Sequence, residues 1–331
     1  MKRGMTMKFK RITALLLAVA MLFTFAACGG NGETPSDATS DYESETKTQV
    51  AALSDALGFG LAKLAKDRDY AYEVKNYSDA EEIVSLLRSG DVDIASLPVD
   101  IAAKLYKETN GGIKILSVNN LGMLCCIENG NAIKSFDDLR GKTVKAVGKD
   151  TVYEFVINYV LTQKGLVPGK DITVEYGSTA EELAKLSAEG KADFVIVPEP
   201  YATNILFKNE KAHKLINFTK SWNEISENPL VLGVIVARTD FISENPDTIT
   251  EFMGFNEVSV NFVNANPESA AVFFADNGYY ETSEIAYASL PEANIRYVEG
   301  EVMKSAVKSL LGMIFASDPT SIPDDGIYYV Y

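Results

Sequence analysis

A repeated segment constrains the fold of this chain more than any other feature of its sequence. Residues 77–106, YSDAEEIVSLLRSGDVDIASLPVDIAAKLY, align without a gap with residues 177–206, GSTAEELAKLSAEGKADFVIVPEPYATNIL. Two copies of one unit, a hundred residues apart, predict two similar lobes. The identical pairs are Ser78/Ser178, Ala80/Ala180, Glu81/Glu181, Glu82/Glu182, Leu86/Leu186, Gly90/Gly190, Asp93/Asp193, Pro98/Pro198 and Ala102/Ala202.

Each copy predicts a helix, a strand and a second helix. The Ser at 78 or 178 is the expected N-cap, because Glu residues follow it by three or four positions, and the Gly at 90 or 190 is expected to end the helix. A short apolar strand follows, and a Pro opens the next helix. Such units build parallel α/β sheets, in which ligands bind beyond the carboxyl ends of strands. The loops 97–100 and 197–201 are therefore the predicted walls of a cleft.

The first 27 residues have the pattern of an export signal. Five basic residues precede an apolar run over residues 12–27, and the first acidic residue is Glu33. That run is shorter than the roughly 20 residues of a membrane-spanning helix. The junction Phe25-Ala26-Ala27-Cys28 resembles a bacterial lipobox, which predicts cleavage before Cys28, a diacylglycerol on its sulfur, and a location on the outer face of the bacterial cytoplasmic membrane. The alternative is an ordinary signal peptide with an incidental Cys.

Composition defines the remaining regions of the chain. Residues 28–47 are small and polar, which predicts a flexible tether. Loss of residues 1–27 removes five positive charges and no negative one, so the formal net charge changes from −15 to −20. A surface so acidic argues against nucleic acid as a partner. With 47% apolar residues in 331, the rest is long enough for two domains. We predict lobe 1 from residues 48–127 and 229–331, and lobe 2 from residues 128–228.

Neither the cysteines nor the single histidine predicts a metal site or a cofactor. Cys125 and Cys126 lie in the apolar stretch LGMLCCIE, which favours buried thiols in a strand over a metal or redox role. His213 lies in the polar context NEKAHKL, where a surface position is the simplest interpretation. Periodicity and capping residues predict further helices at about 59–66, 152–164, 246–264, 267–276 and 299–316. Further strands are expected at 70–75, 113–118, 121–128, 172–176, 215–219 and 230–237. The aromatic C-terminal tail is expected to pack on a lobe.

The strand-to-helix turn at Gly148-Lys149-Asp150-Thr151 is the closest approach to a chemical motif. Backbone N–H groups at a helix N-terminus, with the Thr151 hydroxyl and the Lys149 ammonium, form a cradle for an anion or a carbonyl group. Simple helix capping is the alternative. The equivalent turn of the other lobe, Ser54-Asp55, faces loop 97–100. Asp55 and Asp100 would balance Lys149 and suit a solute with an amine or a polar heterocycle, unless they are solvated surface carboxylates.

Aromatic and amide side chains complete the predicted site. Tyr201 and Trp222 are candidates for stacking on a flat ligand, with core packing as the alternative for both. Glu199, Asn119 and Asn120 lie at the ends of strands. The full set of predicted ligand-binding residues is Ser54, Asp55, Pro98, Asp100, Asn119, Asn120, Lys149, Asp150, Thr151, Pro198, Glu199, Tyr201 and Trp222.

The signal, the lipobox, the tether and the doubled unit together resemble the lipoprotein solute receptors of ATP-binding-cassette importers. The runs SFDDLRGKTVKAVGK from Ser135 and GKADFVIVPEP from Gly190 resemble the branch with nitrate, alkanesulfonate and thiamine-precursor receptors. This resemblance implies the α/β fold of type II periplasmic binding proteins, with two lobes that are joined by crossing strands and close over a solute. It also implies a membrane permease and an ATPase as partners, no catalysis and no cofactor. We expect the chain to be a monomer.

Two other functions remain open for a chain with this pattern. A pyrimidine-synthase-like enzyme has the same fold, but that family implies a cysteine-rich iron-binding run and a reactive His. Here Cys125-Cys126 stands alone and His213 lies in a charged segment, which disfavours the enzyme. A sensor or surface lipoprotein could use the same cleft without transport, and neighbouring genes for a permease and an ATPase would distinguish these possibilities.

Overall fold

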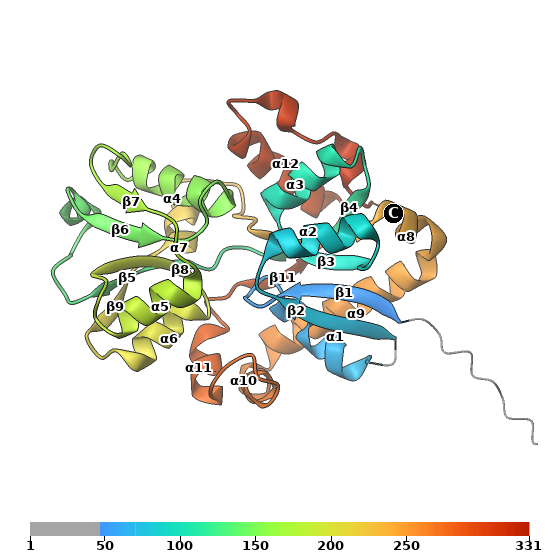
Figure 1. Ribbon diagram of the computed structural model, residues 1–331, viewed down its shortest axis with the longest axis horizontal. Coiled ribbons are helices and arrows are strands. Elements are labelled where there is room, and N and C mark those ends of the chain that lie inside the picture. Colours follow the sequence, from blue (N-terminus) through green and yellow to red (C-terminus); the bar gives the residue numbers. More distant parts are fainter. Residues whose placement is uncertain (1–46, 70, 331) are drawn as a thin grey trace, which may run out of the picture. The chain divides into compact units, whose positions relative to one another are not determined.

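The computed structural model describes residues 47–69 and 71–330 (Figure 1). The predicted signal, the lipobox with Cys28 and nearly all of the tether lie outside the described residues. Among the described helices, none combines the length and the apolar character needed to cross a membrane. The described chain is an α/β structure with a six-stranded and a five-stranded sheet, which confirms the predicted fold class.

Lobe 1 is built on the six-stranded sheet, in the order β11-β4-β10-β3-β1-β2. Apolar residues alternate between its two faces. Val50 and Ala52 of β1 pack with α8 and α9, whereas Ala51 and Leu53 face the core beneath α2 and α3. The strands are β1 (Thr48–Leu53), β2 (Tyr72–Tyr77), β3 (Ile94–Pro98), β4 (Ile113–Asn120), β10 (Gly233–Arg238) and β11 (Ile295–Val298).

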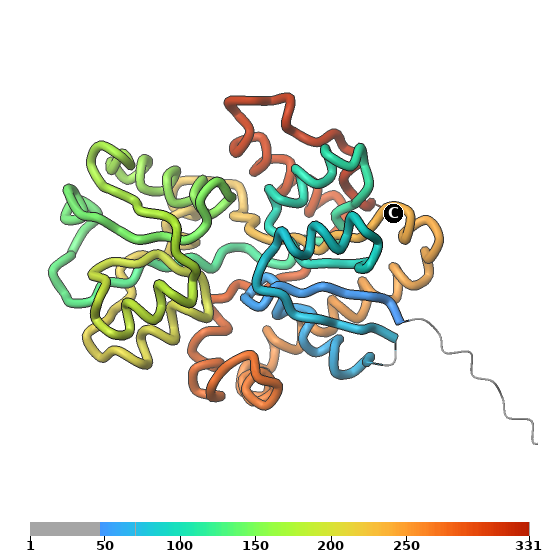
Figure 2. The backbone as a smooth tube through the Cα atoms, in the orientation of Figure 1, coloured from blue at the N-terminus to red at the C-terminus, as the bar shows by residue number. Residues whose placement is uncertain are grey.

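Lobe 2 repeats this topology in the order β7-β6-β8-β5-β9. β3 and β8 are the strands of the two repeat copies. Each has an antiparallel neighbour: β10 pairs with β3, and β5 pairs with β8. β5 and β10 follow the segments by which the chain passes between the lobes, which can be traced in Figure 2. The strands are β5 (Leu124–Asn129), β6 (Thr143–Ala146), β7 (Thr173–Glu175), β8 (Phe194–Pro198) and β9 (Ala212–Asn217).

The helices cover both sheets and connect their strands. Lobe 2 contains α4 (Val152–Gln163), α5 (Ala180–Ala188), α6 (Tyr201–Lys208) and α7 (Phe218–Asn223). The other α-helices are α1 (Ala62–Asp67), α2 (Ala80–Ser89), α3 (Val99–Glu108), α8 (Thr239–Glu244), α9 (Pro246–Ala265), α10 (Pro267–Asp276), α11 (Ser283–Ser289) and α12 (Gly300–Ile314). The 3-10 turns are η1 (Phe59–Leu61), η2 (Phe136–Leu139), η3 (Pro319–Ser321) and η4 (Asp325–Ile327).

The repeat corresponds to α2–β3–α3 in lobe 1 and α5–β8–α6 in lobe 2, as predicted. The predicted N-caps are wrong by one residue: Asp79 and Thr179 cap the helices, not Ser78 and Ser178. In lobe 2 the Thr179 hydroxyl accepts the Glu182 N–H, and the Glu182 carboxylate accepts the Thr179 N–H, which completes a capping box. In lobe 1 the Asp79 carboxylate accepts the Glu81 N–H at 2.9 Å, so the cap is an Asp rather than the preceding Ser.

The structure also moves two predicted boundaries. The boundary between residues 127 and 128 falls inside β5, which pairs with β8 and β9, so the crossing lies at residues 121–123. The strand expected at 215–219 ends at Asn217, because the Asn217 side chain accepts the Lys220 N–H at 2.9 Å and starts α7. The C-terminal tail packs on lobe 1 as expected, with the Tyr329 N–H donating to the Ile115 carbonyl at 2.9 Å.

Candidate functional site

Asp55 lies in the turn after β1, at the carboxyl end of the lobe 1 sheet. Its Oδ1 accepts the Leu57 N–H at 2.9 Å, which holds the turn. Part of the side chain is open to solvent, yet burial of its carboxylate raises its pKa to about 6, against a smaller opposing effect of the Leu57 N–H. Among the described residues, no Lys or Arg contributes to lowering this pKa. Asp55 is therefore a carboxylate without a compensating cation.

Asp100 occupies the first turn of α3, beyond the end of β3. Its side chain is 2% exposed, and the Lys104 Nζ lies 3.5 Å from Oδ2. Burial raises the pKa of Asp100, while Lys104 and the Val152 N–H lower it. Oδ1 makes no hydrogen bond of ordinary geometry within the described part of the chain. Because Val152 belongs to α4, this carboxylate of lobe 1 faces a helix N-terminus of lobe 2.

The turn at Gly148-Lys149-Asp150-Thr151 is a helix cap. The Thr151 hydroxyl accepts the Tyr153 N–H at 3.2 Å and donates to the Gly148 carbonyl at 2.7 Å, so its one donor is used within the turn. Gly148 has φ +80°, and a Cβ there would lie 2.6 Å from the Tyr153 Cβ. The turn is therefore built to place Tyr153.

Lys149 is exposed and forms its ion pairs within lobe 2, not with the carboxylates of lobe 1. Its Nζ lies 2.6 Å from the Glu154 carboxylate and 3.6 Å from that of Asp150. The Asp150 side chain is also exposed, and its backbone N–H donates to Glu154 at 2.7 Å. The structure does not bring Lys149 to Asp55 and Asp100, the pairing on which the expected charge balance rests.

Two tyrosines of lobe 2 face these carboxylates. Burial raises the pKa of Tyr153 well above its usual value, and Asp55 and Asp100 raise it further. Burial also raises the pKa of Tyr201, with additional effects of Asp55 and Glu181. The structure thus brings together Asp55, Asp100 and Tyr201 from the predicted set. Tyr153 was missed, although its place two residues after the capping Thr151 was a usable signal.

We call the place where Asp55 and Asp100 of lobe 1 meet Tyr153 and Tyr201 of lobe 2 the junction. A cavity of about 500 Å³ adjoins the junction at Tyr201. It runs along the groove between α5 and α6, so the second copy of the repeat supplies most of its wall. The Lys208 ammonium contacts the Glu281 carboxylate at 2.5 Å at one end of this cavity. The lining residues are Glu181, Ala184, Lys185, Ala188, Glu189, Tyr201, Asn204, Ile205, Lys208 and Glu281. The sequence predicts a site at loop 197–201 and not this cavity, because its walls are side chains along α5 and α6, and their spacing depends on how the two helices pack.

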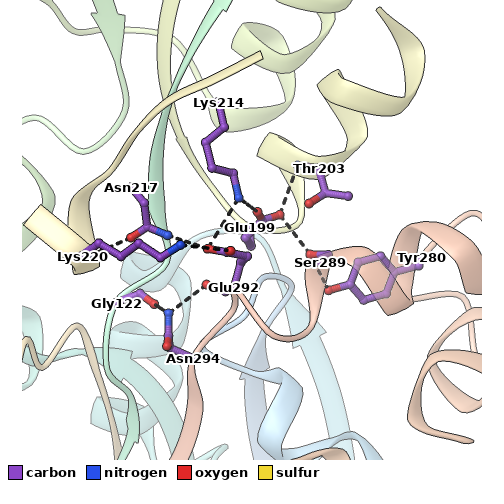
Figure 3. Close-up of polar contacts among 10 residues, drawn as sticks. All are labelled: Gly122, Glu199, Thr203, Lys214, Asn217, Lys220, Tyr280, Ser289, Glu292 and Asn294. Carbon is purple, nitrogen blue, oxygen red and sulfur yellow. Dashed lines mark hydrogen bonds and ion pairs between the residues drawn. The ribbon is translucent and has the colours of Figure 1, made fainter. Parts of the chain in front are cut away.

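Glu199 belongs to a buried polar network (Figure 3). Its Oε2 accepts the Thr203 N–H at 3.1 Å and the Ser289 hydroxyl at 3.0 Å, and Ser289 in turn accepts the Tyr280 hydroxyl at 3.0 Å. The Lys214 Nζ lies 3.7 Å from Oε1. Burial raises the pKa of Glu199, and Lys214 lowers it. With 0% exposure, Glu199 connects α6 and β9 with α11 and is not presented to a ligand.

The segment after α11 ties this network to the crossing between the lobes (Figure 3). Glu292 accepts a hydrogen bond from the Asn217 amide and lies 3.5 Å from the Lys214 Nζ, and both partners belong to β9. The Asn294 amide donates to the Gly122 carbonyl at 2.7 Å, in the segment that joins β4 to β5. This segment therefore holds lobe 2 and the crossing together.

The other predicted residues lie at buried positions of the fold, except Ser54 and the exposed Lys149 and Asp150. Asn120 is fully buried, donates to the Ala293 carbonyl at 2.7 Å and accepts the Gly122 N–H at 2.8 Å. Asn119 is buried and donates to the Leu57 carbonyl. Pro98 and Pro198 are buried strand ends, and Ser54 is exposed.

Trp222 lies in the core of lobe 2 and is not brought to the junction. It is 0% exposed, its ring centroid lies 5.1 Å from that of Tyr159, and its Nε1 donates to the Asn228 carbonyl at 2.8 Å. The structure therefore supports the core-packing alternative for Trp222, because helix α7 turns it inward from an otherwise polar segment.

Cys125 and Cys126 are buried free thiols in β5, as predicted. Burial, with a further effect of Glu199, raises the pKa of Cys125 to about 12, and burial also raises that of Cys126. Both thiols are therefore protonated at neutral pH and unreactive. The His213 Nε2 lies 3.1 Å from the buried Glu128 carboxylate, which belongs to the neighbouring strand β5.

Two known proteins with related sequences or structures indicate the kind of protein to which this arrangement belongs. A protein of Bacillus subtilis (strain 168), "Putative binding protein YtlA", is 22% identical over 248 residues, which are 71% of this chain and 68% of that protein. An ABC transporter structure from Parabacteroides distasonis has a TM-score of 0.72 at 19% identity, over 86% of this chain and 99% of that one.

A third similar protein is the alkanesulfonate-binding protein SsuA from Xanthomonas axonopodis pv. citri. Its structure with MOPS has a TM-score of 0.67 at 13% identity, over 86% of this chain and 98% of that one. These structures show the two-lobed fold of periplasmic binding proteins. The model of the NMT1/THI5-like family matches residues 66–270, which is more than half of the sequence. The chain belongs to the NMT1/THI5-like family.

Proposed function

We propose that this chain is the extracytoplasmic solute-binding component of an ABC importer. It captures a small solute between its two lobes and delivers it to a membrane permease, which a partner ATPase powers. The observation that carries this proposal is the meeting of both lobes at the junction, where Lys104 of lobe 1 donates to the Asp150 carbonyl of lobe 2 at 3.2 Å. At the same place Asp55 raises the pKa of Tyr153 and Tyr201, and Asp100 raises that of Tyr153. Groups from two lobes that converge on one place suit a ligand that is enclosed when the lobes close.

The family relationship supports a role in binding. SsuA of Xanthomonas axonopodis pv. citri is named for alkanesulfonate binding, and a structural neighbour from Synechocystis PCC 6803, NrtA, is named for nitrate binding. Both are named as solute-binding proteins, and their two names give chemically different solutes. The same scaffold therefore suits capture of a solute, whereas the identity of that solute depends on the side chains of each site.

A membrane anchor at Cys28 is part of this proposal. A lipid on Cys28 and the tether of residues 28–47 would keep the lobes at the outer face of the membrane, close to the permease. Replacement of Cys28 by Ala should abolish labelling with radioactive palmitate and release the chain from the membrane fraction. Unchanged labelling of the variant would contradict the anchor but not the binding function.

The proposed function includes no chemical conversion of the solute. The two buried thiols are protonated, and His213 pairs with Glu128 between β5 and β9 rather than joining the carboxylates and tyrosines of the junction. A thermal-shift screen of amines, amino acids, pyrimidines, sulfonates and oxyanions tests for binding, since a ligand at a hundred times its Kd stabilises by about 2.7 kcal/mol. Each solute that binds should be recovered unchanged after incubation with the chain, and a converted product would contradict the proposal.

A further inference from the structure

The charges at the junction do not cancel. Asp55 and Asp100 contribute two carboxylates, and Lys104 contributes one ammonium group, 3.5 Å from Asp100. Lys149 pairs with Glu154 at 2.6 Å and leaves this balance unchanged. Once Asp55 is ionised, the junction therefore has one uncompensated negative charge, in surroundings where burial makes that charge costly.

Asp100 provides a second and independent indication of a ligand at this place. Its side chain is 2% exposed, and its Oδ1 has no hydrogen bond of ordinary geometry within the described residues. The N–H of Val152, which comes from the opposite lobe, is close enough to lower its pKa, so the carboxylate faces the junction and not the interior of lobe 1. Although N–H groups contact the carboxylate as a whole, its Oδ1 remains a buried oxygen without a hydrogen bond, which is unfavourable and which a ligand N–H group would satisfy.

Aromatic rings accompany the carboxylates on the side of lobe 2. The charges of Asp55 and Asp100 raise the pKa of Tyr153, and the charge of Asp55 also raises the pKa of Tyr201. These four side chains therefore lie near one another. A cation near a carboxylate and an aromatic face gains the Coulomb attraction of the first and about 0.5–2 kcal/mol from the second. The combination favours an organic cation over a small inorganic ion, because an organic cation holds its water less tightly and its body can fill the adjoining cavity of about 500 Å³.

We propose that the solute carries a positively charged nitrogen, an ammonium, amidinium or guanidinium group, which binds at the Asp55 carboxylate beside Tyr153 and Tyr201. This assignment rests on the proposed receptor function and defines the class of its solute. The body of the solute lies in the cavity of about 500 Å³ along α5 and α6, which Tyr201 lines. That cavity has the size of a small-molecule site. Its acidic residues, Glu181, Glu189 and Glu281, outnumber Lys185 and Lys208, which also favours a cation.

Cation binding at Asp55 should depend on pH, because the carboxyl must lose its proton to pair with the cation. Asp55 accepts the Leu57 N–H of its own turn, and its charge raises the pKa of Tyr153 on α4 and of Tyr201 on α6. Asp100, which also raises the pKa of Tyr153, pairs with Lys104 on α3. A cation binds the ionised form of Asp55. With a pKa of about 6, only about one tenth of Asp55 is ionised at pH 5. Binding should therefore be about tenfold weaker at pH 5 than at pH 7.5 and should release protons at pH 5–6.

The test compares probes that differ in charge. Cations are benzylamine, agmatine and choline; benzyl alcohol is the neutral analogue; and benzoate, ethanesulfonate and nitrate are the anions. Thermal shifts followed by calorimetry should detect binding of at least one cation and no binding of the anions. Asp55→Asn should weaken binding of that cation at least tenfold at pH 7.5 and remove its dependence on pH. Glu251→Gln, which removes one exposed negative charge on α9, is the matched control and should bind as the wild type does.

The outcomes separate this assignment from the receptor function. Binding of an anion or of benzyl alcohol without binding of any cation would overturn the assignment and leave a solute receptor in place. Equal cation affinity in Asp55→Asn and in the wild type would also overturn the assignment. If no compound of any charge class binds in this test or in the broader screen, the receptor function itself is contradicted.

Discussion

The Lys104 ammonium on α3 donates a hydrogen bond of 3.2 Å to the Asp150 carbonyl, which precedes α4. The same Nζ lies 3.5 Å from the Asp100 carboxylate. One side chain therefore connects the lobes and compensates a buried charge. Because both contacts lie where the two strand-to-helix turns meet, the stability of the junction and its charge are coupled through Lys104.

Replacement of Lys104 by Gln should lower the free energy of unfolding by about 1 kcal/mol at pH 7.5, as expected for a partly exposed ion pair. The loss should be smaller at pH 4.5. Lys104 lowers the pKa of Asp100, which burial raises, so the variant shifts this pKa further upward. A raised pKa favours folding below the unfolded-state value and disfavours folding as the pH rises through the folded-state value. Urea unfolding at both pH values measures the difference, Lys104→Arg is the control, and an equal loss at both values would contradict this prediction.

Asp55→Asn should stabilise the fold at neutral pH. The pKa of Asp55 is raised from 3.8 to about 6, so its ionisation opposes folding increasingly as the pH rises from about 4 through 6, while well below pH 4 the carboxyl is protonated in both states. The Asn side chain keeps an oxygen for the Leu57 N–H. The Tm of the variant should exceed that of the wild type at pH 8, and the difference should shrink steadily toward pH 4. A Tm difference that does not depend on pH would show that ionisation of Asp55 does not destabilise the folded state.

Gly148→Ala should destabilise the turn before α4 more than Gly141→Ala destabilises its own turn. Both glycines have positive φ, +80° and +76°, a conformation that costs an L-residue about 1–2 kcal/mol. A Cβ at position 148 would also lie 2.6 Å from the Tyr153 Cβ, whereas a Cβ at 141 has nothing within 4 Å. Urea unfolding should give the larger loss for Gly148→Ala. Equal losses would mean that Tyr153 adjusts freely and that the turn does not position it.

Glu199→Ala should lower the free energy of unfolding by about 2–4 kcal/mol, because it leaves buried polar partners unsatisfied. The Thr203 N–H and the Ser289 hydroxyl lose their acceptor, and Lys214 loses a nearby carboxylate. Glu199→Gln keeps one acceptor oxygen and should cost less. Ser289→Ala removes one of these donors and should cost about 1 kcal/mol. A Glu199→Ala variant as stable as the wild type would show that the network does not hold α6 to α11.

The sequence repeat was sufficient to predict the fold because the signals involved are local. Caps, glycine stops and apolar strands all act within about ten residues, so α2–β3–α3 and α5–β8–α6 could be located with the loops that follow each strand. Sheet topology, applied to the two copies, predicts that Asp55, Asp100 and the turn before α4 lie at the ends of strands that face each other.

The remaining parts of the site depend on contacts between residues that are distant in sequence. Glu199 resembles a cleft residue in sequence, but Ser289 and Lys214 reach it from α11 and β9 and bury it. Trp222 lies in a polar segment, and only the packing of α7 against Tyr159 turns it into the core. Lys149 pairs with Glu154 in the first turn of α4, and this local partner keeps its ammonium away from the carboxylates of lobe 1.

The claim that both lobes hold one solute is tested most directly by calorimetric titration of the first solute that stabilises the wild-type chain. Asp55→Ala alters lobe 1, Tyr201→Ala alters lobe 2, and Glu251→Gln is the control on the exposed surface of α9. We expect one solute per chain, at least tenfold weaker binding in each of the first two variants, and wild-type affinity in the control. Wild-type affinity in either Asp55→Ala or Tyr201→Ala would contradict a site shared between the lobes at this junction.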